Sequence, residues 1–406
     1  MRQYYYLLVI ILLAASCKGG HKSNQLSSDV EGADSCTVEA DVYRGPVTIH
    51  IDDKMVPLYD TLTLNNLIES VRYIPLESSD SALTNASSVR KMGDIYCVTG
   101  GFPSSIMKLF DADGKYIMDA FRLGRAREEV AEFTIYLIDT PGREIVANSF
   151  FTDKYVFLNV DSLSYRTIYN ENRNFRQLKT LGNRHYVGFT ENNWVARGSA
   201  IKETYDSLPH LMFYDSDLNI TGTVGDGAKP YLDLETTVPP RLDSYMYASG
   251  DGVIYKYADA DTVFTVDADE QMVPVIILDI PDKLKPTMKQ SLMDPASRKA
   301  QMIYADQFQL SRDYVFIEYQ YGGQILSGIW SRNTGQLLFL NKFSYSRNPI
   351  LISVDGYSIR SNVNYLSRRD NVIIIPIDAS YLVGTIPGIK EDDNQVIMEI
   401  TLRPGL

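Results

Sequence analysis

A short pattern recurs along most of the chain, and its period restricts the possible folds more than any other feature. An apolar or aromatic run is followed by an aspartate, a polar turn and a second apolar run. The aspartates of the four clearest copies are Asp111, Asp161, Asp215 and Asp267, spaced 50, 54 and 52 residues apart. Repeats of this length are typical of stacked or radially arranged units.

Each copy predicts a β-hairpin. Asp, Asn, Ser and Gly favour turns, and an aspartate side chain can accept a hydrogen bond from backbone two residues further on. The flanking runs alternate as strands do, for example in residues 106–110 and 253–257. A second strand pair precedes each hairpin, most clearly at residues 88–92 and 95–98. Each repeat therefore contains about four short strands.

Looser copies of the pattern lie at residues 329–337 and 376–379. Roughly 330 residues from Leu76 onward, divided by a period of about 52, give six repeats. The sequence predicts an all-β fold, a six-bladed β-propeller of four-stranded blades. Residues 68–76 and 396–402 are each predicted to be a strand, and we expect both to join the last blade and close the ring.

One segment interrupts the series between the fourth and fifth predicted blades. Its apolar residues recur roughly at helical spacing, and Pro295 is compatible with a first helical turn. We predict a short helical insertion at about residues 281–313; a long irregular loop is the alternative. The residues that carry the spacing are Met288, Leu292, Met293, Ala296, Ala300, Ile303 and Tyr304.

The N-terminus has the composition of a secretory signal. One cation is followed by about a dozen apolar residues and then by small residues, a run too short for a comfortable membrane span. Residues 13–17, Leu-Ala-Ala-Ser-Cys, resemble the lipobox of bacterial lipoproteins, although Ala14 stands where leucine is commonest. This resemblance implies a signal peptide at 1–16 and lipidation of Cys17; a plain signal peptide is the alternative.

Residues 17–46 are rich in Ser, Asp, Glu and Gly and are predicted to be a flexible tether ahead of a propeller at 47–406. Surface-exported lipoproteins of the Bacteroidetes tend to carry acidic residues directly after the cysteine, whereas Lys18 and Lys22 are basic here. The expected location is therefore the cell envelope, with a lipid anchor in the outer membrane that faces the periplasm.

The charge balance argues against nucleic acid as a partner. The chain has 51 acidic against 39 basic residues and a net charge of −12, whereas phosphate binding requires a basic surface. Besides Cys17 the cysteines are Cys36, in the tether, and Cys97, in a predicted strand. A disulfide between them is possible in an oxidising compartment, and a buried free Cys97 is the alternative.

No motif predicts a metal, a cofactor or a catalytic residue. Asp111, Asp113 and Gly114 resemble the start of an EF-hand loop, but the twelfth position is Arg122 rather than glutamate, so a hairpin turn is expected. There is no Gly-x-Ser-x-Gly elbow and no His-x-His or His-Glu-x-x-His motif. The isolated histidines are expected at surfaces or turns; beyond the tether they are His50, His185 and His210.

The densest charge cluster lies in a predicted connection between blades. It is either part of a binding surface or a solvated turn. Its members are Arg122, Arg125, Arg127, Glu128 and Glu129.

Three stretches together resemble a large family of six-bladed β-propeller lipoproteins from the Bacteroidetes, related to NHL-type propellers. They are Val-Arg-Tyr-Ile-Pro-Leu-Glu at 71–77, Leu-Phe-Asp-Ala-Asp-Gly-Lys at 109–115 and the acidic closing strand at 391–398, where Gln395 replaces the usual proline. The family's Gly-Pro-Gly-Glu-Tyr-like stretch is largely absent at 124–133. The family is largely uncharacterised, so the resemblance implies no catalytic residue.

These observations lead us to expect a non-catalytic binding module for an envelope protein, a peptide or a glycan. The alternative is an enzyme that acts on glycans, a lyase or a hydrolase, through the central funnel. A third possibility is a purely structural envelope protein. Polar groups that converge in the funnel with shifted pKa values would favour the enzyme.

Overall fold

The computed structural model divides the chain into two units, Met1–Tyr43 and Arg44–Leu406, and the structure is described for parts of the second. The predicted signal peptide, Cys17, Cys36 and nearly all of the tether lie outside the described residues and stay predictions. The described residues are 45–55, 66–100, 106–131, 134–149, 154–169, 177–189, 211–224, 245–249, 252–256, 260–285, 303–322, 324–343, 350–354, 357–361 and 370–405.

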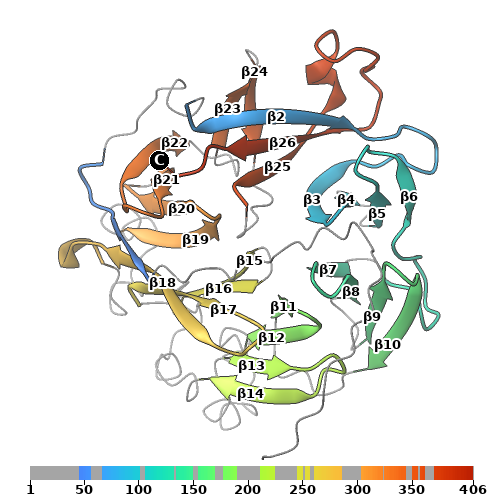
Figure 1. Ribbon diagram of the computed structural model, residues 1–406, viewed down its shortest axis with the longest axis horizontal. Coiled ribbons are helices and arrows are strands. Elements are labelled where there is room, and N and C mark those ends of the chain that lie inside the picture. Colours follow the sequence, from blue (N-terminus) through green and yellow to red (C-terminus); the bar gives the residue numbers. More distant parts are fainter. Residues whose placement is uncertain are drawn as a thin grey trace, which may run out of the picture. The chain divides into compact units, whose positions relative to one another are not determined.

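Six blades follow one another around a ring (Figure 1), and blades one, two, three and five are each a four-stranded sheet of consecutive strands. Blade one contains β3 (Ala86–Met92), β4 (Ile95–Gly100), β5 (Met107–Phe110) and β6 (Tyr116–Asp119). Blade two contains β7 (Thr134–Asp139), β8 (Glu144–Ser149), β9 (Lys154–Asn159) and β10 (Ser164–Tyr169). Blade three contains β11 (Gln177–Gly182), β12 (His185–Phe189), β13 (Leu211–Tyr214) and β14 (Ile220–Val224).

Blade four contains β15 (Tyr245–Ser249), β16 (Gly252–Lys256), β17 (Thr262–Val266) and β18 (Met272–Asp279), with β1 (Val47–His50) at its edge. Blade five contains β19 (Tyr304–Leu310), β20 (Tyr314–Tyr321), β21 (Gln324–Ser331) and β22 (Leu337–Phe343). Blade six contains β25 (Val372–Ile377), β26 (Val396–Leu402) and β2 (Ile68–Pro75), and the hairpin β23 (Ile350–Val354) and β24 (Tyr357–Ser361) pairs separately. The predicted six-bladed propeller is confirmed.

The hydrophobic core consists of six clusters, one for each pair of neighbouring blades. The cluster between blades two and three, for example, packs Val146 and Phe157 against Tyr186 and Met212. Alternating residues of a strand point to opposite faces of its sheet, so each blade contributes to two clusters. The ring is therefore held together at its blade interfaces.

The ring closes through the two strands expected to do so. The N-proximal strand β2 lies antiparallel to β26, with Val71 opposite Ile400. Asn394, which precedes β26, is buried and donates hydrogen bonds to the carbonyl oxygens of Glu77 (2.5 Å) and Ala82 (3.0 Å). The acidic closing motif and the Ile-Pro-Leu-Glu entry motif thus meet at the seam of the ring.

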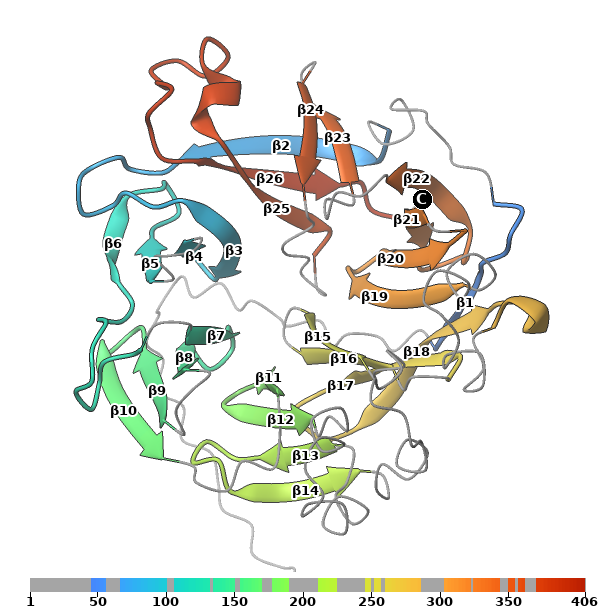
Figure 2. The same ribbon diagram turned by 180° about the vertical axis from the view of Figure 1, so that it is seen from behind.

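Blade four has a fifth strand that the repeat did not predict. Strand β1 pairs in parallel with β18, and Figure 2 shows it along the outer edge of this blade. Ile49 and Ile51 are fully buried in the cluster between blades four and five. The pattern of β1 is short and precedes the first repeat, so the period gave no signal for it.

The predicted insertion at 281–313 is wrong at its C-terminal end. Residues 304–310, which include Tyr304, form β19, the first strand of blade five, rather than a helix. A short 3-10 turn, η3 (Asp282–Leu284), opens the segment, and residues 286–302 lie outside the described part. In the described residues no helix has the length and apolar character needed to cross a membrane.

The repeated aspartates form hairpin turns between the third and fourth strands, as predicted, but in two versions. Asp111, Asp215 and Asp267 each accept hydrogen bonds from backbone N–H groups two and four residues later. In blade two the capping residue is Asn159, which accepts from the N–H of Ser162 at 2.9 Å. The expectation that Asp161 is the fourth equivalent residue is therefore wrong.

Antiparallel strands alternate in direction, so the loops of a blade divide between two sides of the ring. We call the side that carries the aspartate turns and the loops between first and second strands the box-turn side. The other side, the connection side, carries the loops between second and third strands and the connections between blades. This division organises the charged and the exposed apolar residues.

Candidate functional site

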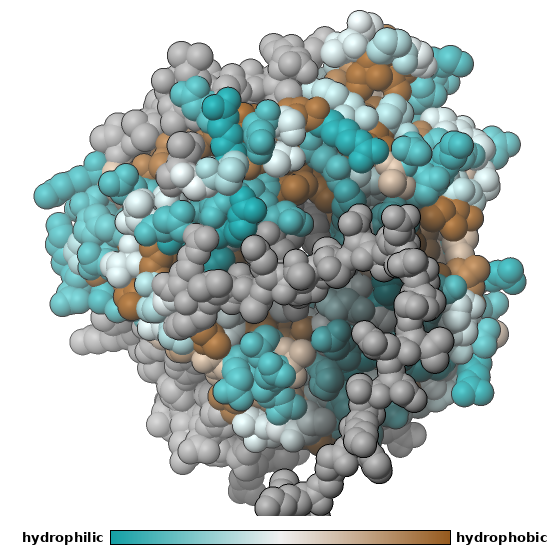
Figure 3. Space-filling model, viewed as in Figure 1, coloured by the Kyte–Doolittle hydropathy of each residue, from teal (hydrophilic) through white to brown (hydrophobic). Residues whose placement is uncertain are grey.

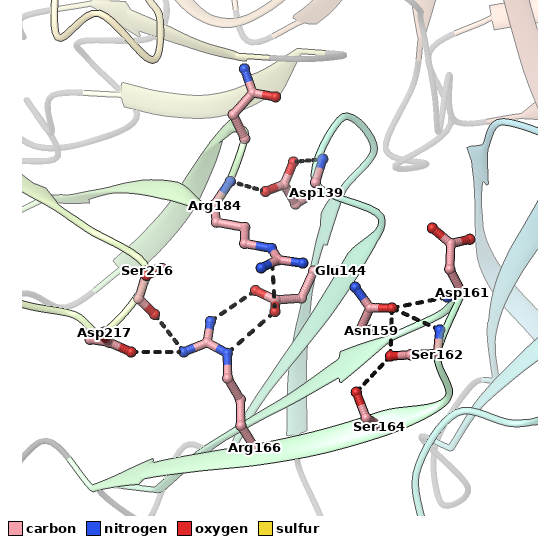
Figure 4. A network of polar contacts seen from close by, with 12 residues as sticks. Asp139, Glu144, Asn159, Asp161, Ser162, Ser164, Arg166, Arg184, Ser216 and Asp217 are labelled. Atoms are coloured by element: carbon pink, nitrogen blue, oxygen red, sulfur yellow. Dashed lines mark hydrogen bonds and ion pairs between the residues drawn. The ribbon is translucent and has the colours of Figure 1, made fainter.

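The most extensive described network of charged side chains lies between blades two and three (Figure 4). Its centre is Glu144, a buried carboxylate on β8. Arg166 on β10 pairs with it at 3.0 Å, and the hydroxyl of Tyr186 on β12 donates a hydrogen bond at 2.8 Å. Arg166 also donates to the carbonyl oxygen of Ser216 at 2.6 Å and pairs with Asp217 at 3.5 Å, both in the aspartate turn of blade three.

Asp139 extends this network and is fully buried at the end of β7. Its carboxylate accepts hydrogen bonds from the backbone N–H groups of Gly142 and Arg184. Burial raises the pKa of Asp139, and the Glu144 carboxylate adds to this rise, while the backbone donors oppose it. The pKa of Tyr186 is raised chiefly by burial and further by Glu144.

A related arrangement, without the tyrosine hydrogen bond, occurs between blades six and one. Glu399 on β26 pairs with Lys91 at 2.6 Å and with Arg72 on β2 at 3.8 Å. Arg72 in turn donates to the carbonyl oxygen of Ala112 in the aspartate turn of blade one, at 2.8 Å. Burial raises the pKa of Tyr96, the counterpart of Tyr186, and Glu399 adds to this rise.

The occurrence of similar networks at two blade interfaces indicates a structural role for both. In both copies an arginine of an outer strand connects a carboxylate of its own blade to the aspartate turn of the next blade. An enzyme needs one reaction centre, whereas a ring of blades must be stabilised at several blade interfaces. We therefore assign both networks to the fold, although their shifted pKa values resemble those of active sites.

Other residues singled out in the sequence are structural as well. Cys97 is a free, buried thiol whose pKa is raised by burial to about 12, so it is unreactive. His50 is exposed on β1, between Asp279 (3.0 Å) and Asp52 (3.3 Å). Asp279 raises the pKa of His50 most strongly. His185 lies at the start of β12, and His210 lies outside the described residues.

One ionisable group with a perturbed pKa lies near the ring centre. Lys179 is on β11, the innermost strand of blade three, and Arg90 is on β3, the innermost strand of blade one. Burial, together with the positive charge of Arg90, lowers the pKa of Lys179 to about 8. Among the described residues no group of three or more His, Cys, Asp or Glu side chains is arranged to hold a metal ion.

Exposed large apolar side chains are concentrated on the connection side. Ten are exposed in the described residues, and six belong to connection-side loops or to the strand ends next to them. By the same rule the box-turn side has three, Ile117, Leu163 and Ile220, and Ile277 lies on the outer strand β18. The six are Leu83, Leu123, Ile135, Tyr169, Tyr381 and Val383. Exposed apolar groups that gather on one side are typical of an interaction surface.

The most exposed of these side chains, that of Tyr381, belongs to residues 378–395, the β25–β26 segment. Tyr381 is 66 % exposed and Val383 48 %. The segment is fixed at its start by Asp378, which caps the turn η4 (Ala379–Leu382), and at its end by Asn394. Figure 3 shows apolar atoms at the upper right, over this segment, with hydrophilic atoms around them. A rigid base thus presents an apolar tip to solvent.

The fold defines this chain as a six-bladed β-propeller. The chain belongs to the DUF4934 family, a domain of unknown function, which matches residues 46–401. A putative exported protein from Bacteroides fragilis has a similar fold, with a TM-score of 0.59 and 14% sequence identity over 88% of this chain and 100% of that protein. A DUF4221 family member from Bacteroides vulgatus has a TM-score of 0.46 and 9% identity over 83% of this chain and 97% of its own. No curated protein matches the chain.

Proposed function

We propose that this propeller is a non-catalytic binding module that recognises another envelope protein through its connection side. The observation that carries the proposal is the concentration of exposed apolar side chains there, above all Tyr381 and Val383 on a rigidly held segment. Rigid loops with exposed aromatic residues are suited to recognition because little conformational entropy is lost on binding.

The buried carboxylates support the same proposal. Glu144 and Glu399 are occupied by arginine, lysine and tyrosine partners at blade interfaces, and Asp139 accepts two backbone N–H groups. Groups engaged in this way are positioned to stabilise the ring. We therefore assign recognition of the partner protein to the solvent-exposed side chains of the connection side.

The location we propose is the cell envelope. The lipobox-like sequence ending at Cys17 would provide a lipid anchor, and residues 17–46 would be the tether that connects it to the propeller. The Bacteroides fragilis protein of similar fold is described as a putative exported protein, which agrees with export. The basic residues after Cys17 favour a periplasm-facing anchor in the outer membrane.

A glycan-active enzyme is the second candidate, and the observation that favours it is Lys179. A lysine with a pKa of about 8 near the ring centre can accept a proton close to neutral pH. Lys179→Met would then abolish cleavage of a glycan substrate. If the protein is a binding module, the same substitution leaves capture of the partner unchanged.

The test is a crosslinking pull-down of the tagged, lipid-anchored protein from its native envelope. The variant Tyr381→Ser/Val383→Ser removes the apolar tip, and Leu163→Ser/Ile220→Ser removes two equally exposed apolar groups elsewhere. We expect the wild type and the control to capture one partner that the tip variant loses. Equal capture by all three forms would exclude the tip, and no capture by any form would contradict the binding module.

A further inference from the structure

We propose that the arginine loop, defined as residues 120–131 with Arg122, Arg125 and Arg127, binds an acidic segment of the partner protein. The loop connects blades one and two on the connection side. This inference rests on the proposed function, because it names the chemistry of part of the partner. It does not depend on the apolar tip of the β25–β26 segment.

The arginines of this loop form no side-chain hydrogen bond or ion pair among the described residues. Eight other arginines whose side chains are described have hydrogen-bond, ion-pair or electrostatic partners within the protein, whereas in the loop the described contacts give only Arg122 a partner, an electrostatic interaction with Tyr165. All three are exposed. The eight partnered arginines are Arg72, Arg90, Arg143, Arg166, Arg184, Arg312, Arg332 and Arg403. Three neighbouring guanidinium groups thus have no ion-pair partner in the described part of a protein whose net charge is −12.

The backbone of the arginine loop is held in place from several directions. The N–H of Gly124 donates to the carbonyl oxygen of Val130 at 2.9 Å, and the N–H of Val130 donates to that of Arg122 at 2.8 Å. The Lys154 ammonium donates to the carbonyl oxygens of Ala126 (2.8 Å) and Glu129 (2.5 Å). The arginines are therefore presented from a fixed frame, and ligand binding need not order the loop.

The two glutamates of the loop offset part of the charge of its three arginines, but neither forms an ion pair with them among the described residues. The Glu129 carboxylate accepts a hydrogen bond from the N–H of Ala126 at 2.8 Å and lies against Gly124, where a Cβ atom would be 1.9 Å from Oε2. Glu129 therefore stabilises the turn itself. Glu128 is exposed and forms no ion pair in the described residues, so the loop keeps an excess of positive charge.

Apolar groups accompany the charges. Leu123 is 43 % exposed, and Tyr169 at the end of β10 is 63 % exposed. The hydroxyl of Thr167 donates to the carbonyl oxygen of Arg127 at 2.8 Å, which places the end of β10 beside the loop. Arginine and tyrosine are the residue types enriched in protein-binding hot spots, and guanidinium groups bind carboxylates in a bidentate manner.

The charge distribution favours a protein segment over an anionic membrane. The same side of the ring carries the β25–β26 segment, where Glu391 and Asp392 are exposed. A broad anionic surface would meet these carboxylates as well as the arginines and would be repelled. A short acidic segment can contact the arginine loop alone, with an apolar residue against Leu123 or Tyr169.

The first experiment titrates a fluorescein-labelled peptide of alternating glutamate and leucine into the soluble propeller. It compares the wild type with Arg122→Gln/Arg125→Gln/Arg127→Gln and with Lys54→Gln/Lys115→Gln/Lys390→Gln. The lysine variant loses the same charge from three exposed sites outside the loop. We expect the arginine variant to bind about tenfold more weakly, the lysine variant to bind like the wild type, and added salt to weaken wild-type binding.

Equal peptide binding by both variants would overturn the inference, as would binding of phosphatidylglycerol vesicles with no binding of the peptide. Thermal melting confirms that both variants are folded. The envelope pull-down separates the two proposals. If the arginine variant captures the same partner as the wild type, this inference fails and the binding module stands; if the wild type captures none, the binding module fails.

Discussion

The two sides of the ring use charged residues for different purposes. On the box-turn side, Arg72 and Arg166 each join a carboxylate of one blade to the aspartate turn of the next. On the connection side, the arginines of the arginine loop are exposed and form no ion pair in the described part of the chain. We thus assign stability to the box-turn side and recognition to the connection side. Substitutions on one side should then change one property without the other.

The largest expected effect comes from Glu144→Gln. The substitution removes the charge that pairs with Arg166 and accepts from Tyr186. We expect a loss of about 3 kcal/mol in the free energy of unfolding, because a buried network then loses its central partner. Urea denaturation measures it. Glu128→Gln, at an exposed position on the connection side, is the control and should be neutral; equal effects would refute the division.

A pair of glycines gives a sharper comparison. Gly114 in the aspartate turn of blade one and Gly384 in the β25–β26 segment both have φ of +81°. A Cβ atom at Gly114 would lie 2.2 Å from the carbonyl oxygen of Pro75 in blade six, whereas at Gly384 nothing lies within 4 Å. We expect Gly114→Ala to cost about 3 kcal/mol and Gly384→Ala about 1 kcal/mol. Similar unfolding midpoints would show that the turn does not brace the neighbouring blade.

Lys179→Met tests the ring centre, which belongs to neither side. The folded-state pKa of about 8 is below the ordinary lysine value of 10.5, so the charged form is disfavoured in the folded protein. Wild-type stability should therefore rise as the pH increases from about 8 to 10.5. We expect Lys179→Met to stabilise the protein by about 2 kcal/mol below pH 8, and the gain to vanish above pH 10.5. A gain that is constant with pH would contradict this.

The smallest effect on stability is expected for Tyr381→Ser/Val383→Ser. Both side chains face solvent, so the free energy of unfolding should change by less than about 0.5 kcal/mol. Thermal melting measures it. A large loss of stability would show that the apolar tip packs within the protein, and the loss of the partner in the pull-down would then have another explanation.

Much of the ring could be predicted from the sequence because its repeat is local. Asp111 and its counterparts form turns with backbone two and four residues away, so their pattern is visible in a short window. The same reasoning failed at Asp161, because Asn159 caps a turn with a different offset. It also failed at Tyr304, where apolar residues at helical spacing belong to a strand.

The charged networks around Glu144 and Glu399, and the arginine loop, could not be predicted from a local pattern. Glu144 and Ser216 are 72 positions apart, and they meet at Arg166 only because two blades are neighbours in the ring. The arginine cluster was visible as a dense run of charge, but its lack of ion pairs depends on Lys154 and Glu129 satisfying the loop's backbone. Whether an arginine forms an ion pair depends on the tertiary structure. The sequence alone could therefore not distinguish a binding surface from a solvated turn.

The pairing of β2 with β26 has a consequence for how the chain is made. Val71 on β2 lies opposite Ile400 on β26, so the ring cannot close until β26 has been synthesised. Until then β2 has no partner in its sheet, and unpaired strand edges promote aggregation. A product truncated before β26 keeps five blades and loses the seam. Ring closure therefore depends on β26, and a chain that lacks this strand exposes an unpaired edge to proteases and to other chains.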